Sequence, residues 1–422
     1  MNPVCNYTTR TTCRVCGSEK LTPLFSLGNQ YVSDFVPEDK VHAGHQCPID
    51  IEMCADCTLV QAKHTAPQDF LYTRHYWYRS GVTQTMRDAL KDIVDTAVSV
   101  VGGLEPGDIV LDIGSNDGTL LRNYVGHGVV KVGVEPASNL EHVGKIGVDV
   151  FINDFWDSRK YFNHVIGFKN GIGPFKAKII TACGMFYDLE DPNQFIADIA
   201  ETLHPNGVFI AQLMCLKNML STWDLGNFAH EHLEFFSLKS LQKLFDQWGL
   251  ELYDLTTNKV NGESYRLFVR HKRSSAFSDI SPHVQQAIES EEQYARPIYY
   301  YNFRQHMEEN RSRCVNFIRD KAAYGKKIWV YGASTKGNVI LQWYGLGYPL
   351  IQGAADRSPE KHGKYTIGTG IPIYSEEYAR EQNPDYFLVL PYAFLEEFIE
   401  REHVWRMKGG KFIIPLPNFR IV

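Results

Sequence analysis

Four of the nine cysteines stand in two Cys-x-x-Cys pairs near the N-terminus, Cys13 with Cys16 and Cys54 with Cys57. Two such pairs, a few tens of residues apart, can place four thiolates tetrahedrally around one zinc ion. The odd cysteine total and this pairing argue against a disulfide framework. Nothing in the segment offers a fifth ligand or a general base, so we expect the zinc to hold the fold and to take no part in chemistry. Buried free cysteines, or one redox pair with a coincidental second pair, are the alternatives. His42, His45 or Cys47, which lie between the pairs, could also replace one ligand, although four cysteines are the simpler set.

The bulk composition bounds the class of protein. A chain of 422 residues with 44% apolar and 22% charged residues can form two or three globular domains. Its formal net charge of -6 gives no general attraction to nucleic acid or to anionic membranes. No apolar run is long enough to span a bilayer, and the N-terminus lacks the apolar core of a secretory signal. We therefore expect a cytoplasmic protein, and the sequence is as compatible with a monomer as with a dimer.

The hydrophobic pattern divides the chain into three regions, 1–70, 71–275 and 276–422. The middle region begins with an expected helix at about residues 83–101. It then alternates apolar runs of strand length with segments of helical period, which predicts a mostly parallel sheet covered on both faces. The third region opens with a long expected helix and repeats the alternation. The predicted fold class is therefore α/β, with a small zinc ribbon followed by two Rossmann-like domains.

The first strand of the middle region ends in a glycine turn. Gly114 and Gly118 let the backbone approach a ligand where a Cβ would intrude. The Gly-x-Gly-x-x-Gly spacing of dehydrogenases is absent, and an acid, Asp112, precedes the first glycine by two residues. This acid suits a cationic ligand with an amino-acid group better than a pyrophosphate. Asn116 lies in the same turn and is a further candidate for binding this ligand.

Acidic and aromatic residues follow the next two expected strands. Glu135 ends the second strand, where a carboxylate can accept both hydroxyls of a ribose. Asp154 and Phe155 follow the third, where a polar side chain can meet an adenine and a ring can stack on it. Ligands of such sheets bind at the carboxyl ends of the strands. Together these positions predict that the cofactor is S-adenosylmethionine.

The sequence His230-Glu231-His232 follows the strand at about residues 207–213 and its loop. Histidine titrates near neutrality, and a neighbouring glutamate can orient the ring and raise its basicity. The block therefore predicts a site of proton transfer. A second metal site and a hydrogen-bonded structural loop are the alternatives, although the spacing is not the His-Glu-x-x-His of metalloproteases.

A strand, a turn of small residues and a helix start follow one another near residue 330. Backbone N–H groups at the helix N-terminus form an anion site, and Lys336 adds positive charge. A plain helix cap on a structural domain is the alternative. Asp356, at the end of the next strand, could line the same crevice.

The order of these motifs along the chain is similar to that of a known enzyme family. The matching parts are the cysteine pairs, the segment Tyr76-x-Tyr78-x-Ser80-Gly81, the loop Asp112-x-Gly114, the block that begins at His230, and residues 330–333. In these parts the chain resembles the nucleotide-sugar C-3-methyltransferases of deoxysugar biosynthesis over almost its full length. The resemblance implies that the middle domain has the class I fold of enzymes that use S-adenosylmethionine, and that the zinc is structural.

The resemblance also implies a reaction and its residues. The substrate would be a 4-keto-6-deoxy sugar linked to a nucleoside diphosphate, with thymidine or guanosine as the nucleoside. A base removes the C3 proton, which the ketone acidifies, and the carbanion attacks the sulfonium methyl group. His232 corresponds to the base, Glu231 to its neighbour, and Tyr76 or Tyr78 to a residue that reaches over the site. Ser334, Thr335 and Lys336 correspond to positions that hold the sugar's nucleotide.

Two departures from the family pattern bear on the substrate. Ala229 stands where a tyrosine is frequent, and Met185 where a histidine is usual, with Tyr187 close enough in sequence to replace one hydroxyl. They leave the sugar, the stereochemistry and the methylated carbon open. A keto-sugar epimerase, an O- or N-methyltransferase on the same scaffold, and a non-catalytic nucleotide-binding protein are the alternative functions.

Overall fold

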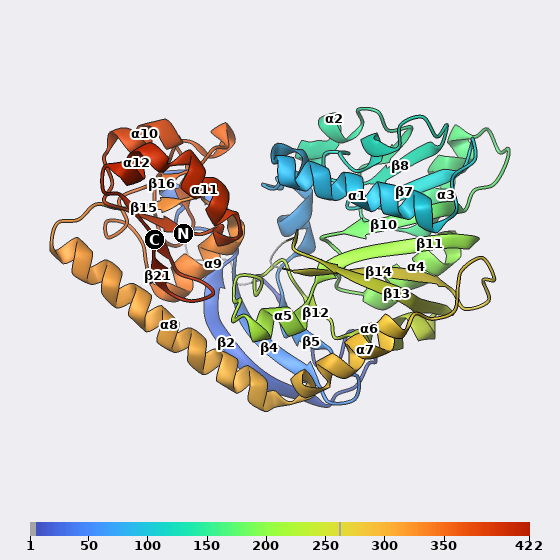
Figure 1. Cartoon of the computed structure of the whole chain (residues 1–422), viewed down its shortest axis with the longest axis horizontal. Coiled ribbons are helices and arrows are strands. Elements are labelled where there is room, and N and C mark those ends of the chain that lie inside the picture. The colour runs from blue at the N-terminus through green and yellow to red at the C-terminus, as the bar shows by residue number, and fades with distance from the viewer. Residues whose placement is uncertain (1–5, 261–262) are drawn as a thin grey trace.

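The computed structural model describes residues 6–260 and 263–422 of the chain. Two α/β lobes stand side by side (Figure 1), one formed by the middle of the sequence and the other by its C-terminal part. An antiparallel sheet of N-terminal strands and the long helix α8 (Pro297–Ala323) run between the lobes at their base. None of the described helices is both long enough and apolar enough to cross a bilayer.

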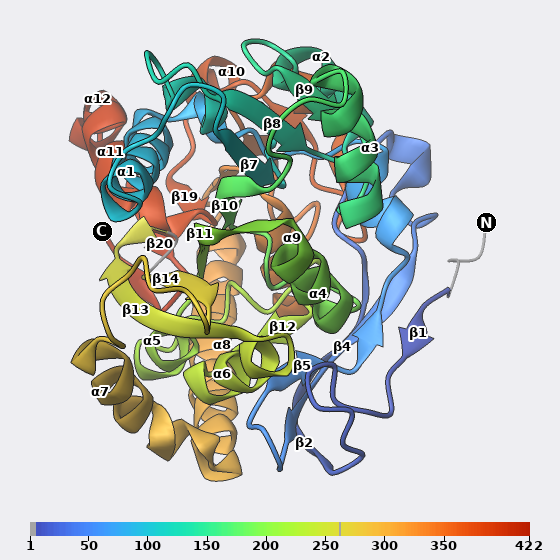
Figure 2. The same ribbon diagram turned by 90° about the vertical axis from the view of Figure 1, so that its right-hand side faces the viewer.

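The N-terminal sheet draws its strands from two parts of the chain. Its order is β12-β5-β4-β2, and every pair is antiparallel. The strands are β2 (Leu21–Tyr31), β4 (Gln46–Cys54), β5 (Val60–Ala62) and β12 (Glu234–Phe235). Figure 2 shows β12 beside β5, so residues just after the His-Glu-His block complete this sheet.

Two short strand pairs add further connections. One joins β1 (Thr8–Thr9) to β6 (His64–Thr65), and the other joins β3 (Phe35–Val36) to β17 (Tyr365–Thr366). Through β12 and β17 the N-terminal segment is hydrogen-bonded to both lobes.

The middle lobe contains a seven-stranded sheet of order β13-β14-β11-β10-β7-β8-β9. Five strands of this sheet are parallel to one another: β7 (Ile109–Ile113), β8 (Val130–Val134), β9 (Val150–Ile152), β10 (Ala177–Cys183) and β11 (Leu203–Met214). The antiparallel strands β13 (Leu250–Asn258) and β14 (Ser264–His271) extend the sheet beyond β11. Every residue of β7 is buried, which explains its continuous apolar run.

Helices cover the middle sheet. They include α1 (Gln84–Val100), α3 (Ser158–Phe168), α4 (Pro192–Thr202), α6 (Leu238–Gln247) and α7 (Pro282–Glu291). The short helix α2 (Glu141–Gly144) follows β8, and α5 (Leu216–Ser221) follows β11 and packs against α8. Thr83 caps α1 by accepting a hydrogen bond from the N–H of Met86 (3.3 Å), and Leu90, Ile93 and Val94 bury its apolar face.

The C-terminal lobe repeats the α/β arrangement with a six-stranded sheet of order β18-β16-β15-β19-β20-β21, in which β21 is antiparallel. Its strands are β15 (Ile328–Tyr331), β16 (Ala354–Ala355), β18 (Ile373–Tyr374), β19 (Tyr386–Val389), β20 (Lys411–Ile414) and β21 (Arg420–Ile421). Its helices are α9 (Thr335–Tyr344), α10 (Glu376–Glu381), α11 (Leu395–Arg401) and α12 (His403–Met407).

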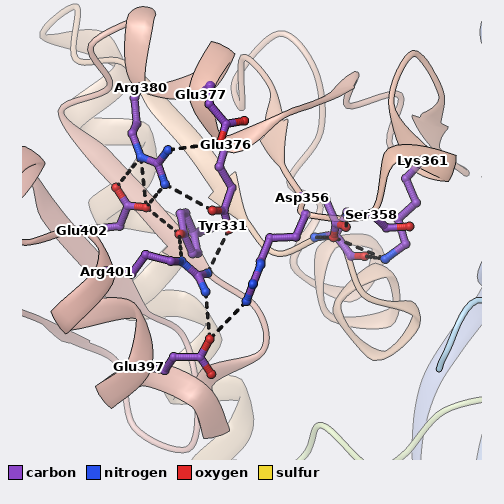
Figure 3. A network of polar contacts seen from close by, with 12 residues as sticks. Tyr331, Asp356, Ser358, Lys361, Glu376, Glu377, Arg380, Glu397, Arg401 and Glu402 are labelled. Atoms are coloured by element: carbon purple, nitrogen blue, oxygen red, sulfur yellow. Dashed lines mark hydrogen bonds and ion pairs between the residues drawn. The ribbon is translucent and has the colours of Figure 1, made fainter. Parts of the chain in front are cut away.

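A polar network fixes the carboxyl end of β15 (Figure 3). The hydroxyl of Tyr331 donates to Oε1 of Glu402 (2.6 Å), which also pairs with Arg380 (2.6 Å). Arg401 donates to the Tyr331 hydroxyl and pairs with Glu376 (2.9 Å), so each buried charge has an opposite partner. The network ties β15 to α10, to α11 and to Glu402, the residue between α11 and α12, and so supports the carboxyl end of β15.

The structure confirms the α/β fold class with an N-terminal cysteine cluster. The helix expected at about residues 83–101 extends from Gln84 to Val100, and the long expected helix of the third region is α8. The division of the chain at residues 70 and 275 stays a prediction. The pairing of β12 with β5 joins the first two regions in one sheet.

Candidate active site

The four paired cysteines come together at one end of the N-terminal sheet. The Sγ atoms of Cys13, Cys16, Cys54 and Cys57 all lie within 4.8 Å of one another. Cys13 Sγ lies 3.4 Å from Cys57 Sγ, and Cys16 Sγ lies 3.5 Å from Cys54 Sγ. Four thiolates at about 2.3 Å from a tetrahedral zinc ion are about 3.8 Å apart, so the donor set and its spacing fit zinc. Among the described residues the four cysteines are enough to fill a tetrahedral zinc site, which fits a structural role.

A cavity of about 560 Å³ lies at the carboxyl ends of the middle sheet's strands. Its walls come from residues between 68 and 90, from the ends of β7, β8, β10 and β11, and from the start of α9 with the loop 390–394. The cavity therefore joins the middle lobe, where parallel sheets bind ligands, to the N-terminal end of a helix in the C-terminal lobe.

The glycine turn after β7 forms one wall of the cavity. Gly114 has φ 69°, and a Cβ at this position would meet the Cγ of Met185 at 2.7 Å, so a larger residue would intrude on the pocket. Next to it, both carboxylate oxygens of Glu135 accept backbone N–H groups, from Asn116 (2.8 Å) and from Ala137 (2.9 Å). Each oxygen keeps a lone pair for a ligand hydroxyl.

This part of the cavity fits the nucleoside and the amino-acid group of S-adenosylmethionine. A glycine cradle, a buried acid at the next strand end, and aromatic residues beyond it are the features that such a ligand requires. Burial raises the pKa of Glu135, while the two N–H groups favour its charged form. Gly114, Asn116, Glu135 and Phe155 line the cavity, together with Trp156, which the sequence analysis did not single out.

Three of the residues predicted to bind the cofactor do not line the cavity. Asp112 lies behind its wall, where the Oγ1 of Thr181 donates to it (2.6 Å) and burial raises its pKa to about 7. Gly118 packs against the backbone of Gly144, and Asp154 pairs with Lys160 (2.5 Å). The roles of these three residues as direct ligands stay predictions.

The imidazole of His232 lines the cavity in a defined orientation. Its Nδ1 lies 2.6 Å from the carbonyl oxygen of Asn227, so Nδ1 carries the proton and Nε2 keeps a free lone pair. Within the described residues, Nε2 has no hydrogen-bond partner. The ring of Tyr187 packs edge-on against the imidazole with centroids 4.7 Å apart. Burial, with a smaller effect of Lys336, lowers the pKa of His232 to about 3, so the ring is neutral at pH 7.

The other two residues of the block lie differently. Glu231 lines the cavity, and its Oε2 is buried without a hydrogen-bond partner. His230 is not part of the cavity wall: its Nε2 lies 2.8 Å from the carbonyl oxygen of Cys47 in β4. Burial lowers the pKa of His230 to about 4, so it is a neutral donor to the N-terminal sheet. A direct catalytic role of His230 stays a prediction.

The tyrosine segment covers the glycine turn. Tyr76 and Tyr78 both line the cavity. The side-chain amide of Asn116 holds this segment, since it donates to the carbonyl oxygen of Tyr78 (3.1 Å) and accepts from the N–H of Ser80 (2.9 Å). The same segment reaches the C-terminal lobe through Arg79, which pairs with Glu360 (2.8 Å).

Sequence reasoning missed several polar residues of the cavity, and two of them lie close to the His-Glu-His block or to Tyr187. The hydroxyl of Tyr72 donates to the carbonyl oxygen of Glu231 (2.6 Å), and Asp188 lines the wall beside Tyr187. Asp188 stands three residues after Met185, so the departure from the family pattern at Met185 pointed to this turn. Tyr72 lies in a short helical segment, Asp69–Thr73, and had no comparable signal.

The C-terminal lobe contributes the start of α9. Ser334, Thr335 and Lys336 line the cavity, and Lys336 Nζ donates to Oδ1 of Asn227 (2.5 Å). Ser334 caps α9 by accepting from the N–H of Gly337 (3.0 Å), which uses one of the helix N-terminal donors. Asp356 lies outside the cavity wall. It accepts from the N–H of Ala333 (2.8 Å) and pairs with Lys361 (3.3 Å), so it fastens the turn before α9 (Figure 3).

The fold and the cavity define the class of S-adenosylmethionine-dependent methyltransferases. The chain belongs to the C-methyltransferase family. It is 30% identical over 415 residues to the C-methyltransferase NovU of Streptomyces niveus, and this alignment covers 97% of this chain and 96% of that protein. Three family models match it, "Putative zinc binding domain" at residues 13–72, "Methyltransferase domain" at 78–255 and "C-methyltransferase C-terminal domain" at 259–417. The predictions of an enzyme, of its methyl donor and of zinc are confirmed.

Solved structures with lower similarity match the middle of the chain. The magnesium protoporphyrin IX methyltransferase ChlM of Synechocystis PCC 6803, with bound S-adenosylhomocysteine, is 13% identical over 46% of this chain and 90% of its own, with a TM-score of 0.33. An S-adenosylmethionine-dependent methyltransferase of Clostridium acetobutylicum is 12% identical over 44% of this chain and 92% of its own, with a TM-score of 0.32. At these scores they add nothing to the assignment.

Proposed function

We propose that this enzyme methylates the carbon next to the ketone, C3, of a 4-keto-6-deoxy sugar linked to a nucleoside diphosphate. The observation that carries the proposal is the orientation of His232 in the cavity. Its Nδ1–H is held by the carbonyl oxygen of Asn227, and its unpartnered Nε2 is left as the proton acceptor. Methylation of oxygen or nitrogen needs no base for a carbon acid, whereas methylation of a carbon next to a ketone does.

The reaction needs an electrophile and a carbanion in the same cavity. S-Adenosylmethionine, when bound, supplies the methyl group: its S–CH₃ bond breaks and the electron pair stays on sulfur, which becomes a neutral thioether. The residues of the chain generate the carbanion. His232 Nε2 takes the proton from C3, and the electron pair of that C–H bond spreads onto the ketone oxygen until it forms the new C–C bond. Glu231, the preceding residue, lines the same cavity and is the proposed neighbour of this base in the sugar site.

The low basicity of His232 in the free enzyme follows from its surroundings. Burial is the main cause of its lowered pKa, and the positive charge of Lys336 adds to it. A diphosphate that pairs with Lys336 cancels this second effect and raises the pKa of His232. Binding of the substrate thus strengthens the base at the step that requires it.

The start of α9 is the proposed site of the diphosphate. Thr335 and Lys336 line the cavity on the side of the C-terminal lobe, opposite the glycine turn. Free N–H groups of the helix N-terminus and the ammonium group of Lys336 favour an anion there. We therefore propose three domains. Residues 1–70 form a zinc-binding domain, residues 71–275 a domain that binds the methyl donor, and residues 276–422 a domain that binds the nucleotide.

Isotope labelling tests the proposed function directly. The enzyme is incubated with S-adenosylmethionine carrying carbon-13 in its methyl group and with thymidine- or guanosine-linked 4-keto-6-deoxyhexoses, and the product is followed by two-dimensional proton–carbon NMR. We expect a new methyl signal at a carbon-bound position with one of the two nucleotides. A methyl signal at an oxygen-bound position, or none with either nucleotide, overturns the proposal. Glu141→Gln, a substitution at a partly exposed residue outside the cavity, serves as the matched control for the active-site variants.

A further inference from the structure

Asp188 is a carboxyl group in the cavity wall that neither the family pattern nor the proposed reaction uses. It follows β10 in a turn closed by its own N–H, which donates to the carbonyl oxygen of Met185 (3.0 Å). The residue is 8% exposed and lines the cavity beside Tyr187, whose ring contacts the imidazole of His232. Its Oδ1 is buried without a hydrogen-bond partner among the described residues.

The charged groups around Asp188 are mostly negative. Glu231 lines the same cavity, and Oε2 of Glu234 accepts a hydrogen bond from the N–H of Leu189, the next residue after Asp188. Two cations lie near these acids in the described structure: Lys336, whose Nζ donates to Asn227, and Arg14, which pairs with Glu234 (3.7 Å). No ion pair joins either of them to Asp188 among the described residues. Further titratable neighbours are the phenols of Tyr72, Tyr76 and Tyr187, whose pKa values Asp188 helps to raise.

A buried carboxyl group that has neither a cation partner nor hydrogen-bond donors to its oxygens favours its neutral form. Burial raises the pKa of Asp188 well above its ordinary value, and the charges of Glu234 and Glu231 raise it further, against a smaller opposite effect of Lys336. A neutral carboxyl group carries an O–H donor, and a carboxylic acid kept neutral by its surroundings can donate a hydrogen bond to an enolate oxygen.

We propose that Asp188 is a protonated carboxylic acid that donates a hydrogen bond to the ketone oxygen of the substrate. This assignment rests on the proposed function. As His232 takes the C3 proton, negative charge moves to the ketone oxygen, and the O–H of Asp188 holds that oxygen as an enolate. The proton stays on Asp188 throughout, and the enolate returns to a ketone when the new C–C bond forms. Asp188 thereby supplies a donor in a site where Ala229 and Met185 provide none.

Replacing Asp188 by asparagine tests whether this residue acts as a neutral hydrogen-bond donor or as a carboxylate. Asp188→Asn keeps a hydrogen-bond donor of similar size but cannot ionise, whereas Asp188→Ala removes the donor. In a C3 proton-exchange assay in deuterated water we expect the rate to fall no more than about tenfold in Asp188→Asn and by about 10²–10³ in Asp188→Ala, the range for a lost oxyanion donor. Equal losses in the two variants overturn the assignment.

Infrared spectroscopy measures the proton on Asp188 without substrate. The wild-type enzyme at pH 7 should show the carbonyl stretch of a neutral carboxyl group that is absent from Asp188→Asn. Asp157→Asn is the matched control, since hydrogen bonding to Arg159 lowers the pKa of Asp157 to about 2 and this residue lies outside the cavity. If the band is unchanged in Asp188→Asn, Asp188 is ionised and the assignment fails, even where Asp188→Ala does not fold.

The two proposals fail in different ways. A wild-type enzyme that exchanges no C3 proton with any nucleotide-linked keto sugar overturns the proposed function, and the role of Asp188 with it. A wild-type enzyme that exchanges the proton, together with equal losses in the two variants or an unchanged infrared band, overturns the role of Asp188 alone.

Discussion

The Nδ1–H of His232 donates to the backbone carbonyl oxygen of Asn227 across 2.6 Å, and this bond determines which ring nitrogen is the base. A turn holds the pair together, since the N–H of His232 itself donates to the carbonyl oxygen of Ala229 (3.1 Å). Asn227 also accepts from Lys336 through its side chain. One residue thus orients the proton acceptor and the cation that faces the proposed diphosphate.

Replacing His232 tests its role as the base. His232→Gln should reduce methyl transfer by about 10²–10⁴, the usual contribution of a general base. The affinity for S-adenosylmethionine, measured by calorimetry, should change less than about threefold, because the glycine turn and Glu135 are untouched. His230→Gln is the matched comparison, since His230 faces β4 and not the cavity. Similar losses of activity in both variants, at unchanged stability, would contradict the assignment.

The two buried histidines give the fold a defined pH dependence. Burial lowers the pKa of His232 to about 3 and of His230 to about 4, whereas both are near 6.5 in the unfolded chain. Between pH 6.5 and the lowered pKa values, the unfolded chain binds more protons than the folded chain does. The free energy of unfolding therefore decreases as the pH falls below about 6.5.

Each histidine should contribute a slope of up to about 1.4 kcal/mol per pH unit between pH 6 and 5. Urea denaturation at these two pH values measures it, and the slope should be smaller in His230→Gln than in the wild type. An equal slope in both proteins would show that His230 is not held neutral.

Glu135 is expected to bind the ribose of the methyl donor. Glu135→Gln replaces a charged acceptor, and the affinity for S-adenosylmethionine should fall by about 10–100-fold, as hydrogen bonds to charged groups contribute about 1.5–3 kcal/mol. Calorimetry measures the affinity, and a thermal melt checks that the N–H groups of Asn116 and Ala137 are still held. An affinity within a factor of two of that of Glu141→Gln would refute this role.

Removal of zinc should destabilise the enzyme and not only inactivate it. Cys57→Ser should bind less than one zinc ion per chain by elemental analysis and should melt at least about 5 °C below the wild type, because metal binding contributes to folding. Cys314→Ser, which changes a buried cysteine in α8 outside the cluster, should keep its zinc. Full zinc content in Cys57→Ser would remove this residue from the ligand set.

The features that the sequence predicted correctly are those with a local physical cause. The cysteine spacing is sufficient to identify the cluster, because each Cys-x-x-Cys turn brings its own two sulfurs together. Burial on both faces explains the apolar run of β7, and Gly114 has the positive φ that its turn requires. Each of these features can be read from a short stretch of sequence, although distant segments complete the meeting of the two cysteine pairs and the burial of β7.

What the sequence could not predict depends on pairing across the chain. The addition of β12 to the N-terminal sheet turns the His-Glu-His block, so His230 reaches β4 while His232 faces the cavity. Asp112 had the sequence spacing of a cofactor ligand, yet its carboxylate accepts a hydrogen bond from the hydroxyl of Thr181 on the neighbouring strand. Asp188 gains its proposed role because burial and the nearby acids Glu231 and Glu234 raise its pKa, and these neighbours come together only in the folded chain.

Proton exchange at C3 without a methyl donor tests the central claim most directly. The enzyme and a nucleotide-linked 4-keto-6-deoxyhexose are mixed in deuterated water, and proton NMR follows the C3 proton in the wild type and in His232→Gln. Enzyme-dependent loss of that signal in the wild type, slowed at least about 10²-fold in His232→Gln, is the result we predict. Retention of the C3 proton by the wild type with both thymidine- and guanosine-linked sugars, or equal exchange in the two proteins, would contradict the account.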